Sequence, residues 1–236
     1  MNIAVIYGSM RHGTTYHCAE SLIEALSGYE EAEISRFFLP RDMSEMCQSC
    51  YSCFLNGEQS CPHNAQVRPI VDALERAQVI ILASPVYALD VSGPMKTLLD
   101  HLCYLWVTHR PSPVMFSKIG VAICTTGGAG LNHTAKTLTN SLKFWGTRRQ
   151  VVMKRAVGAS KWEEVSPKNR AWIAINAHRL AARIAKAVKK TEKLPVSPFM
   201  QGLFFIMSKV MKNNTWSLRD KEYWDENGWL AGGRPY

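Results

Sequence analysis

Residues 79–85 read Val-Ile-Ile-Leu-Ala-Ser-Pro, and residues 79–83 of this stretch form the clearest buried strand of the chain. A short, continuous apolar run that ends at turn residues is typical of a strand covered on both faces. Such strands belong to parallel sheets, because the helices that connect parallel strands cover both faces of the sheet. This stretch therefore predicts an α/β fold built around a parallel sheet.

Further strands of this kind alternate with amphipathic helices along most of the chain. We expect strands at residues 3–7, 31–38, 79–83, 119–124 and 150–153. We expect helices at residues 16–27, 67–76, 95–105, 133–144 and 167–190. Strands that are each followed by a helix form an open parallel sheet with helices on both faces. In such folds, ligands bind beyond the carboxyl ends of the strands.

The composition is that of a packed protein. The chain has 236 residues, of which 47% are hydrophobic and 20% are charged, and this composition excludes a chain that is disordered as a whole. The alternation predicts one domain over residues 1–193, with a cysteine-rich insertion at 40–66 and a C-terminal extension at 194–236. Within the extension, residues 199–211 are apolar on most faces. They form either a membrane-surface helix or, as we expect, a helical arm packed on another subunit of a homodimer or tetramer.

The positive charge is concentrated in one part of the chain. The net charge is +9, and residues 141–193 contain 14 basic and 3 acidic residues. Such a stretch is either a solvated helix face or a surface that attracts anions. No stacking aromatic residues alternate with the basic ones, so we expect no nucleic-acid partner. We also expect no membrane span, because no apolar run reaches about 18 residues, and a cytoplasmic location, because the N-terminus lacks a secretory pattern.

Three loops follow the first, third and fourth expected strands. Residues 8–15, Gly-Ser-Met-Arg-His-Gly-Thr-Thr, combine hydroxyls, a cation and a helix N-terminus, which together favour an anion. Residues 84–88, Ser-Pro-Val-Tyr-Ala, provide an aromatic side chain that can lie against a flat heterocycle. Residues 125–130, Thr-Thr-Gly-Gly-Ala-Gly, allow a ring to approach the backbone closely. Each loop taken alone is also compatible with an ordinary polar turn.

Taken together, the three loops resemble those of the NAD(P)H-dependent FMN reductases of the flavodoxin-like superfamily, and the resemblance covers about residues 1–190. It implies a flavodoxin-like, doubly wound, five-stranded parallel sheet with strand order 2-1-3-4-5, and FMN as cofactor. The FMN phosphate would contact Ser9, Arg11, Thr14 and Thr15. The ring would contact Pro85, Val86, Tyr87, Ala88, Thr126, Gly127 and Gly128. The second motif continues to Lys96 and Asp100, and His101 follows where the family often has arginine.

The resemblance also implies an activity. The chain would be an FMN-dependent NAD(P)H oxidoreductase that passes a hydride through flavin N5 to a small acceptor, such as a quinone, a nitro compound or a flavin. Because the flavin carries this reaction, no catalytic side chain is assigned.

Four cysteines, followed by Pro62, form the spacing C-x2-C-x2-C-x7-C-P: Cys47, Cys50, Cys53 and Cys61. Bacterial ferredoxins hold clusters with a similar run, whereas zinc prefers two separated pairs. The segment is similar to that of the iron–sulfur flavoproteins, a branch of the same family. This similarity implies a [4Fe–4S] cluster near FMN and an alternative function as an electron carrier with a ferredoxin-like partner. A zinc ion and free thiols remain the other two interpretations. The remaining cysteines are expected to be buried apolar residues: Cys18, Cys103 and Cys124.

Overall fold

The computed structural model describes residues 1–159 and 161–236, and its centre is a parallel sheet. The parallel strands are β1 (Asn2–Tyr7), β2 (Glu33–Phe38), β3 (Val79–Tyr87), β5 (Ile119–Thr126) and β6 (Arg149–Ala156). Their order is β2-β1-β3-β5-β6, and the two-residue strand β4 (Asp90–Val91) pairs antiparallel with β3. The flavodoxin-like order is therefore confirmed for the five parallel strands. The expected numbering differs only because β4 was not predicted.

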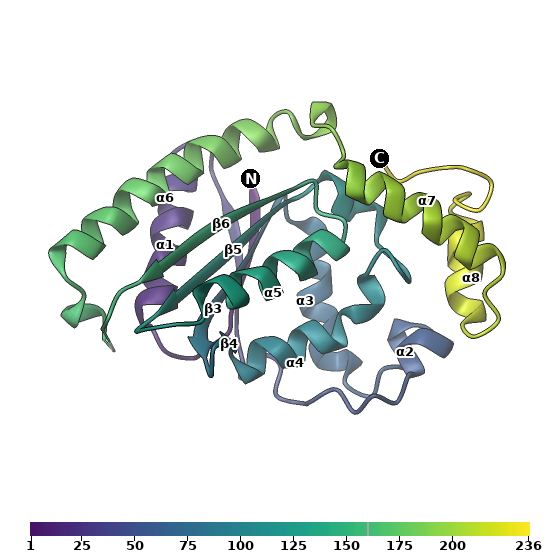
Figure 1. Cartoon of the computed structure of the whole chain (residues 1–236), viewed down its shortest axis with the longest axis horizontal. Helices are drawn as coiled ribbons and strands as arrows, with labels where there is room; N and C mark the ends of the chain where they lie inside the picture. The colour runs from purple at the N-terminus through teal and green to yellow at the C-terminus, as the bar shows by residue number, and fades with distance from the viewer. Residues whose placement is uncertain (160) are drawn as a thin grey trace.

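Helices cover both faces of this sheet (Figure 1). Helices α1 (Thr14–Ser27) and α6 (Pro167–Val188) lie on one face. Helices α3 (Asn64–Arg76), α4 (Gly93–His101) and α5 (Leu131–Phe144) lie on the other. Alternate strand residues point to opposite faces, so each strand contributes to both cores.

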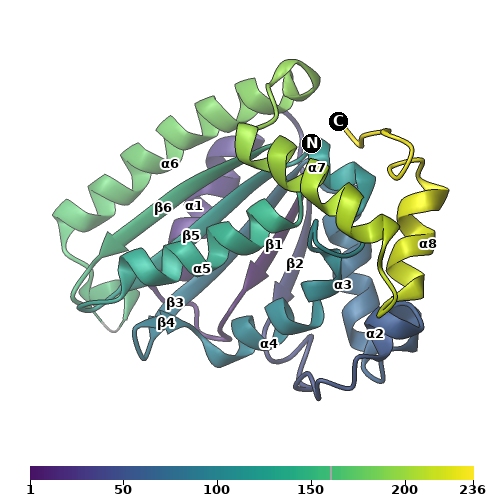
Figure 2. The same cartoon turned by 45° about the vertical axis from the view of Figure 1, so that its right-hand side comes forward.

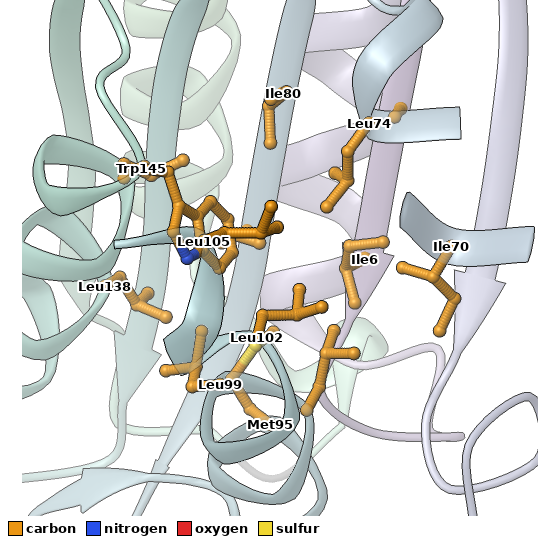
Figure 3. Close-up of a cluster of buried hydrophobic side chains, with 14 of the residues drawn as sticks. Ile6, Ile70, Leu74, Ile80, Met95, Leu99, Leu102, Leu105, Leu138 and Trp145 are labelled. Atoms are coloured by element: carbon orange, nitrogen blue, oxygen red, sulfur yellow. The ribbon is translucent and has the colours of Figure 1, made fainter. Parts of the chain in front are cut away.

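The core beneath α3, α4 and α5 is shown in Figure 3. Ile6 of β1 and Ile80 of β3 lie close to Ile70 and Leu74 of α3, and all four side chains are fully buried. Burying a large aliphatic side chain contributes about 1.5–3 kcal/mol. This packing fixes the sheet on which the strand-end loops are mounted.

A small network of hydrogen bonds joins the ends of β1 and β3 to the start of α4. The Ser92 amide donates to Ser84 Oγ at 3.0 Å, and Ser92 Oγ donates to the carbonyl of Gly8. A Cβ atom on Gly8 would lie 2.7 Å from Ser92 Oγ, so only glycine fits there without a shift. The first two loops are therefore held in one fixed arrangement.

Strand β3 continues past its predicted end at residue 83 to Tyr87. It then turns through Ala88 and Leu89, whose φ angles are 49° and 70°, into β4. Positive φ at both central residues is typical of the type I′ hairpin turn. The expected turn at Ser84-Pro85 is therefore wrong in detail, because β3 stays paired with β5 through Pro85.

The insertion and the extension lie beside each other at one end of the molecule (Figure 2). The insertion contains α2 (Ser52–Leu55) and the 3₁₀ turn Glu58–Ser60, and the extension contains α7 (Pro198–Lys212) and α8 (Leu218–Glu226). Further 3₁₀ turns span Cys103–Leu105, Pro113–Ser117, Trp162–Glu164 and Thr191–Lys193.

The extension packs against its own chain. Phe204 and Trp224, from α7 and α8, are buried with Val107 and Phe116 of the sheet domain in a third apolar cluster. The rest of α7 presents apolar side chains to the outside: Phe199, Phe205, Ile206 and Val210. Across residues 1–159 and 161–236, none of the helices is both long enough and apolar enough to cross a membrane.

Candidate functional site

A cavity of about 330 Å³ lies at the carboxyl ends of β1, β3, β5 and β6. From β1 the chain passes toward one edge of the sheet to form β2, whereas from β3 it passes toward the opposite edge to form β5. The strand order therefore reverses between the neighbouring strands β1 and β3. Ligands of open α/β sheets bind at such a switch point. The volume falls within the usual range of about 300–1,000 Å³ for small-molecule sites.

The first loop forms the polar end of this cavity. Ser9, Arg11 and Gly13 line it, and Ser9 Oγ accepts a hydrogen bond of 3.1 Å from the Arg11 amide. Helix α1 begins after Gly13 without a side-chain cap, so its first-turn amides point toward the loop. Among the described lining residues none is acidic, and Arg11 supplies a positive charge. This is the donor set that an anion such as phosphate requires.

The second loop forms a flat wall. Pro85, Val86 and Tyr87 line the cavity, and the Tyr87 side chain is 43% exposed. Residues Ala88 and Leu89 of the adjoining turn are held at positive φ, a strained state that costs about 1–3 kcal/mol per residue and is common at functional sites. The wall is anchored from behind, since Thr137 Oγ1 of α5 donates to Asp90 at 2.8 Å.

The third loop is fixed to the second by Gly130, which has a φ of 92°. A Cβ atom there would lie 2.6 Å from Val86 Cγ1 and 2.8 Å from the Cα of Leu89. Within the loop, the Gly128 amide donates to Thr126 Oγ1, which donates to the Ala129 carbonyl at 2.9 Å. The loop therefore keeps its shape through its own hydrogen bonds and through close contact with the hairpin.

The structure brings most of the predicted FMN contacts to one cavity. The lining includes Ser9, Arg11, Thr14, Thr15, Pro85, Val86, Tyr87, Thr126 and Gly127, but not Ala88 or Gly128. Ala88 lies in the turn behind the wall. Lys96 and Asp100 form an ion pair on the exposed side of α4, away from this cavity.

A fourth wall of the cavity was not predicted from the sequence. Residues 157–159 follow β6 and line the cavity, as do Tyr7, Tyr16 and Thr125. Thr125 Oγ1 is hydrogen-bonded to Thr15 Oγ1 at 2.7 Å, so it ties the third loop to the first. The position of Val157 directly after a strand was the available signal, since all parallel strands end at this edge.

Replacing Gly130 with alanine should lower both the stability of the fold and the affinity of this cavity for a ligand. The new Cβ must displace the backbone of Leu89 and the Val86 side chain, and overpacking of this kind costs about 1–3 kcal/mol. Thermal unfolding and flavin titration would measure the two effects. Gly128→Ala is the matched control, because a Cβ there meets nothing within 4 Å. Equal behaviour of the two variants would contradict the role given to Gly130.

A second cavity of about 200 Å³ lies in the insertion, at the far end of α4. All four cysteines of the spaced run line it: Cys47, Cys50, Cys53 and Cys61. Cys103 also lines it and is only partly buried, so its assignment as a buried core residue was wrong. Four thiols around one hollow are a donor set that suits an iron–sulfur cluster.

The thiols of this cavity differ in acidity. Burial raises the pKa of Cys53 to about 11 and that of Cys103 to about 12. Hydrogen bonds from Ser52 lower the pKa of Cys50, which is exposed. His101 is 4% exposed, and burial lowers its pKa, so its imidazole is neutral at neutral pH.

The C-terminal extension holds the cysteine segment in place through buried ionic contacts. The Arg110 guanidinium, 3% exposed, donates to the Cys53 carbonyl and pairs with Asp220 of α8, which is fully buried. Ser217 Oγ donates to the Phe54 carbonyl at 2.8 Å and also caps α8. Residues far apart in sequence therefore hold the backbone of Cys53 and Phe54, two residues that line the cysteine cavity.

Helix α4 connects the two cavities. Its N-cap residue, Ser92, is hydrogen-bonded to Gly8, the first residue of the first loop. His101, at the other end of the helix, lines the cysteine cavity. A helix of 9 residues spans about 13 Å. Groups held in the two cavities would therefore be connected by one short, rigid element.

Comparisons with known proteins agree with this geometry. The sequence profile of NADPH-dependent FMN reductases matches residues 1–164. An iron-sulfur flavoprotein of Archaeoglobus fulgidus is 27% identical over 236 residues, covering 98% of this chain and 100% of that protein. An FMN-dependent NADH:quinone oxidoreductase of Burkholderia pseudomallei is 26% identical over 139 residues, covering 56% of this chain and 63% of that protein.

Solved structures support the fold. The NAD(P)H:quinone oxidoreductase of Methanothermobacter marburgensis has a TM-score of 0.60 and 15% identity, over 77% of this chain and 94% of that one. The match to the family profile extends over more than half of the chain and includes the three loops that line the main cavity. The chain therefore belongs to the NADPH-dependent FMN reductase family and is an oxidoreductase.

Proposed function

We propose that this chain binds FMN in the main cavity and uses NAD(P)H to reduce a small acceptor, such as a quinone, a nitro compound or a flavin. The observation that carries the proposal is the joining of an anion-binding loop and a flat wall in one cavity at the strand-order reversal. The phosphate fits the first loop, and the isoalloxazine ring fits between the hairpin and the third loop. The family and the named relatives support the same cofactor.

The residues of the chain position the cofactor and leave the chemistry to it. When bound, FMN supplies a ring that accepts a hydride at its N5 atom. Arg11 and the first-turn amides of α1 hold the phosphate charge, while Pro85 to Tyr87 support the ring. Among the described lining residues there is no histidine, cysteine, aspartate or glutamate. This lining supports a reaction without a protein acid or base.

Replacing Arg11 with alanine should weaken FMN binding by about 10–100-fold, because a charge-assisted hydrogen bond contributes about 1.5–3 kcal/mol. Riboflavin, which lacks the phosphate, should bind both proteins equally. Lys186→Ala removes an exposed cation of α6 that does not line the cavity, and it should leave FMN affinity unchanged. Fluorescence titration measures all three. An equal loss for riboflavin would contradict phosphate binding at Arg11.

The cysteine cavity supports a second part of the proposed function, which is electron transfer through a metal cluster. We propose that Cys47, Cys50, Cys53 and Cys61 hold a [4Fe–4S] cluster that exchanges single electrons with a ferredoxin-like partner. The support is that all four residues line one cavity, which α4 links to the FMN cavity. The name of the Archaeoglobus fulgidus relative points the same way.

The visible spectrum of anaerobically purified protein, with iron and sulfide assays, tests both cofactors. We expect flavin bands together with a broad iron–sulfur absorption and about four iron atoms per chain. A flavin spectrum without iron, even after reconstitution, would contradict the cluster. Protein that fails to bind added FMN would contradict the main proposal.

A further inference from the structure

Two histidines beside the cysteine run have no part in the proposed function, and they lie next to Cys61. Cys61, His63 and His101 offer ligand atoms that all lie within 4.8 Å of one another. His63 Nδ1 lies 3.0 Å from His101 Nε2, and both rings line the cysteine cavity. The group joins the N-terminus of α3 to the C-terminus of α4, so elements far apart in sequence position it.

The hydrogen bonds of this group determine where its lone pairs lie. His101 Nδ1 lies 2.9 Å from the Thr97 carbonyl, which can only accept, so this nitrogen carries the proton. His101 Nε2 is then the ring nitrogen that faces His63, and it lies 3.0 Å from His63 Nδ1. A carbonyl that accepts from the second ring nitrogen is the usual partner of a metal-binding histidine, because it fixes the ring orientation and the tautomer.

The spacing of the nitrogens is close to that around a single metal ion. Zinc binds imidazole nitrogen at about 2.0–2.1 Å and thiolate at about 2.3 Å in tetrahedral geometry, which places two such nitrogens about 3.3 Å apart. The observed 3.0 Å between His63 Nδ1 and His101 Nε2 needs to increase by only a few tenths of an ångström. His63 is only partly buried, so its ring can rotate, whereas His101 is held by the Thr97 carbonyl.

We propose that Cys61, His63 and His101 bind one Zn²⁺ ion in protein that lacks the iron–sulfur cluster, with solvent as the fourth ligand. Binding releases the thiol proton of Cys61 to solvent, and the His63 proton moves from Nδ1 to Nε2. The site holds a thiolate and two neutral imidazoles, a donor set that zinc prefers. It shares Cys61 with the proposed cluster, so the two metals exclude each other, and the zinc-loaded protein keeps only its flavin site.

The test uses full-length, FMN-loaded, cluster-free protein with reduced thiols under anaerobic conditions. Zinc affinity is measured by competition with a chromophoric chelator. His63→Gln should weaken it by more than about 100-fold, since even loss of an outer-shell partner costs about 10–100-fold. Cys47→Ser is the matched control and should bind zinc as the unmodified protein does. Unchanged FMN binding and circular dichroism would show that both variants are folded.

Two results would overturn the proposal: wild-type zinc affinity in His63→Gln, or loss of zinc binding in Cys47→Ser, which would indicate a site made of the four cysteines. Cobalt substitution gives a second readout, because the sulfur-to-cobalt charge-transfer band should correspond to one thiolate per ion and not to four.

The exclusion of the cluster is tested separately. Zinc-loaded protein should take up no iron–sulfur cluster until the zinc is chelated, and simultaneous full loading with both metals would overturn the shared use of Cys61. Only this exclusion rests on the proposed cluster. The chelator titration tests the zinc site even in protein that never assembles a cluster.

Discussion

Replacing Asp220 with alanine should lower the free energy of unfolding by about 3–5 kcal/mol. Asp220 is fully buried and pairs with Arg110, which is 3% exposed, so the substitution leaves a guanidinium charge inside the protein without its main counter-ion. His109 Nδ1, at 2.9 Å, loses the same carboxylate partner. Urea unfolding followed by tryptophan fluorescence measures the loss, since Trp224 lies in the affected helix.

A double variant separates the buried charge from lost packing. Arg110→Met combined with Asp220→Leu removes both charges and keeps apolar volume, and replacement of buried ion pairs in this way is often neutral or stabilising. We expect it to be more stable than Asp220→Ala alone, although the carbonyl of Cys53 loses its donor. A loss below about 1 kcal/mol for Asp220→Ala would mean that the pair behaves as an exposed one.

Replacing Cys53 with serine should abolish the iron–sulfur absorption, because a hydroxyl is a poor substitute for a thiolate ligand. FMN binding should be unaffected, since Cys53 lies outside the main cavity. Visible spectra and iron assays after anaerobic reconstitution measure the change. The flavin bands serve as an internal standard for folded protein.

Cys103→Ser is the matched control for this experiment. Cys103 lines the same cavity but stands outside the spaced run, and burial raises the pKa of its thiol to about 12. It should therefore retain the cluster. Loss of the cluster in Cys103→Ser with retention in Cys53→Ser would assign the ligands differently.

Much of the fold was predictable because hydrophobic periodicity follows burial closely. The run Val79–Ala83 is covered on both faces, and its sequence shows this directly. The first three loops of the main cavity were also predictable, because parallel strands end at the same edge of the sheet. The roles of their side chains toward FMN remain predictions.

The rest of the fold and of the candidate site depends on contacts that leave no local pattern in the sequence. The hairpin at Ala88 and Leu89 lacks the Asn-Gly or Asp-Gly signal of its turn type, and its strained backbone is held by neighbours such as Gly130. The wall at residues 157–159 consists of Val157, Gly158 and Ala159, which have no polar side chain that could mark a site in the sequence. The pairs His63–His101 and Arg110–Asp220 join segments that are distant in sequence, so neither could be inferred from spacing.

The contact between Arg110 and Asp220 also sets an order of events during synthesis. Chains emerge from the ribosome N-terminal end first, so the sheet and the cysteine segment appear well before α8. Until Asp220 follows, Arg110 has only the partly exposed Glu58 carboxylate, at 3.4 Å, as a counter-ion, and its hydrogen bond to the Cys53 carbonyl is not yet held in place. Nascent chains should therefore complete the main cavity first, and insertion of the proposed cluster at the cysteines should follow translation instead of accompanying it.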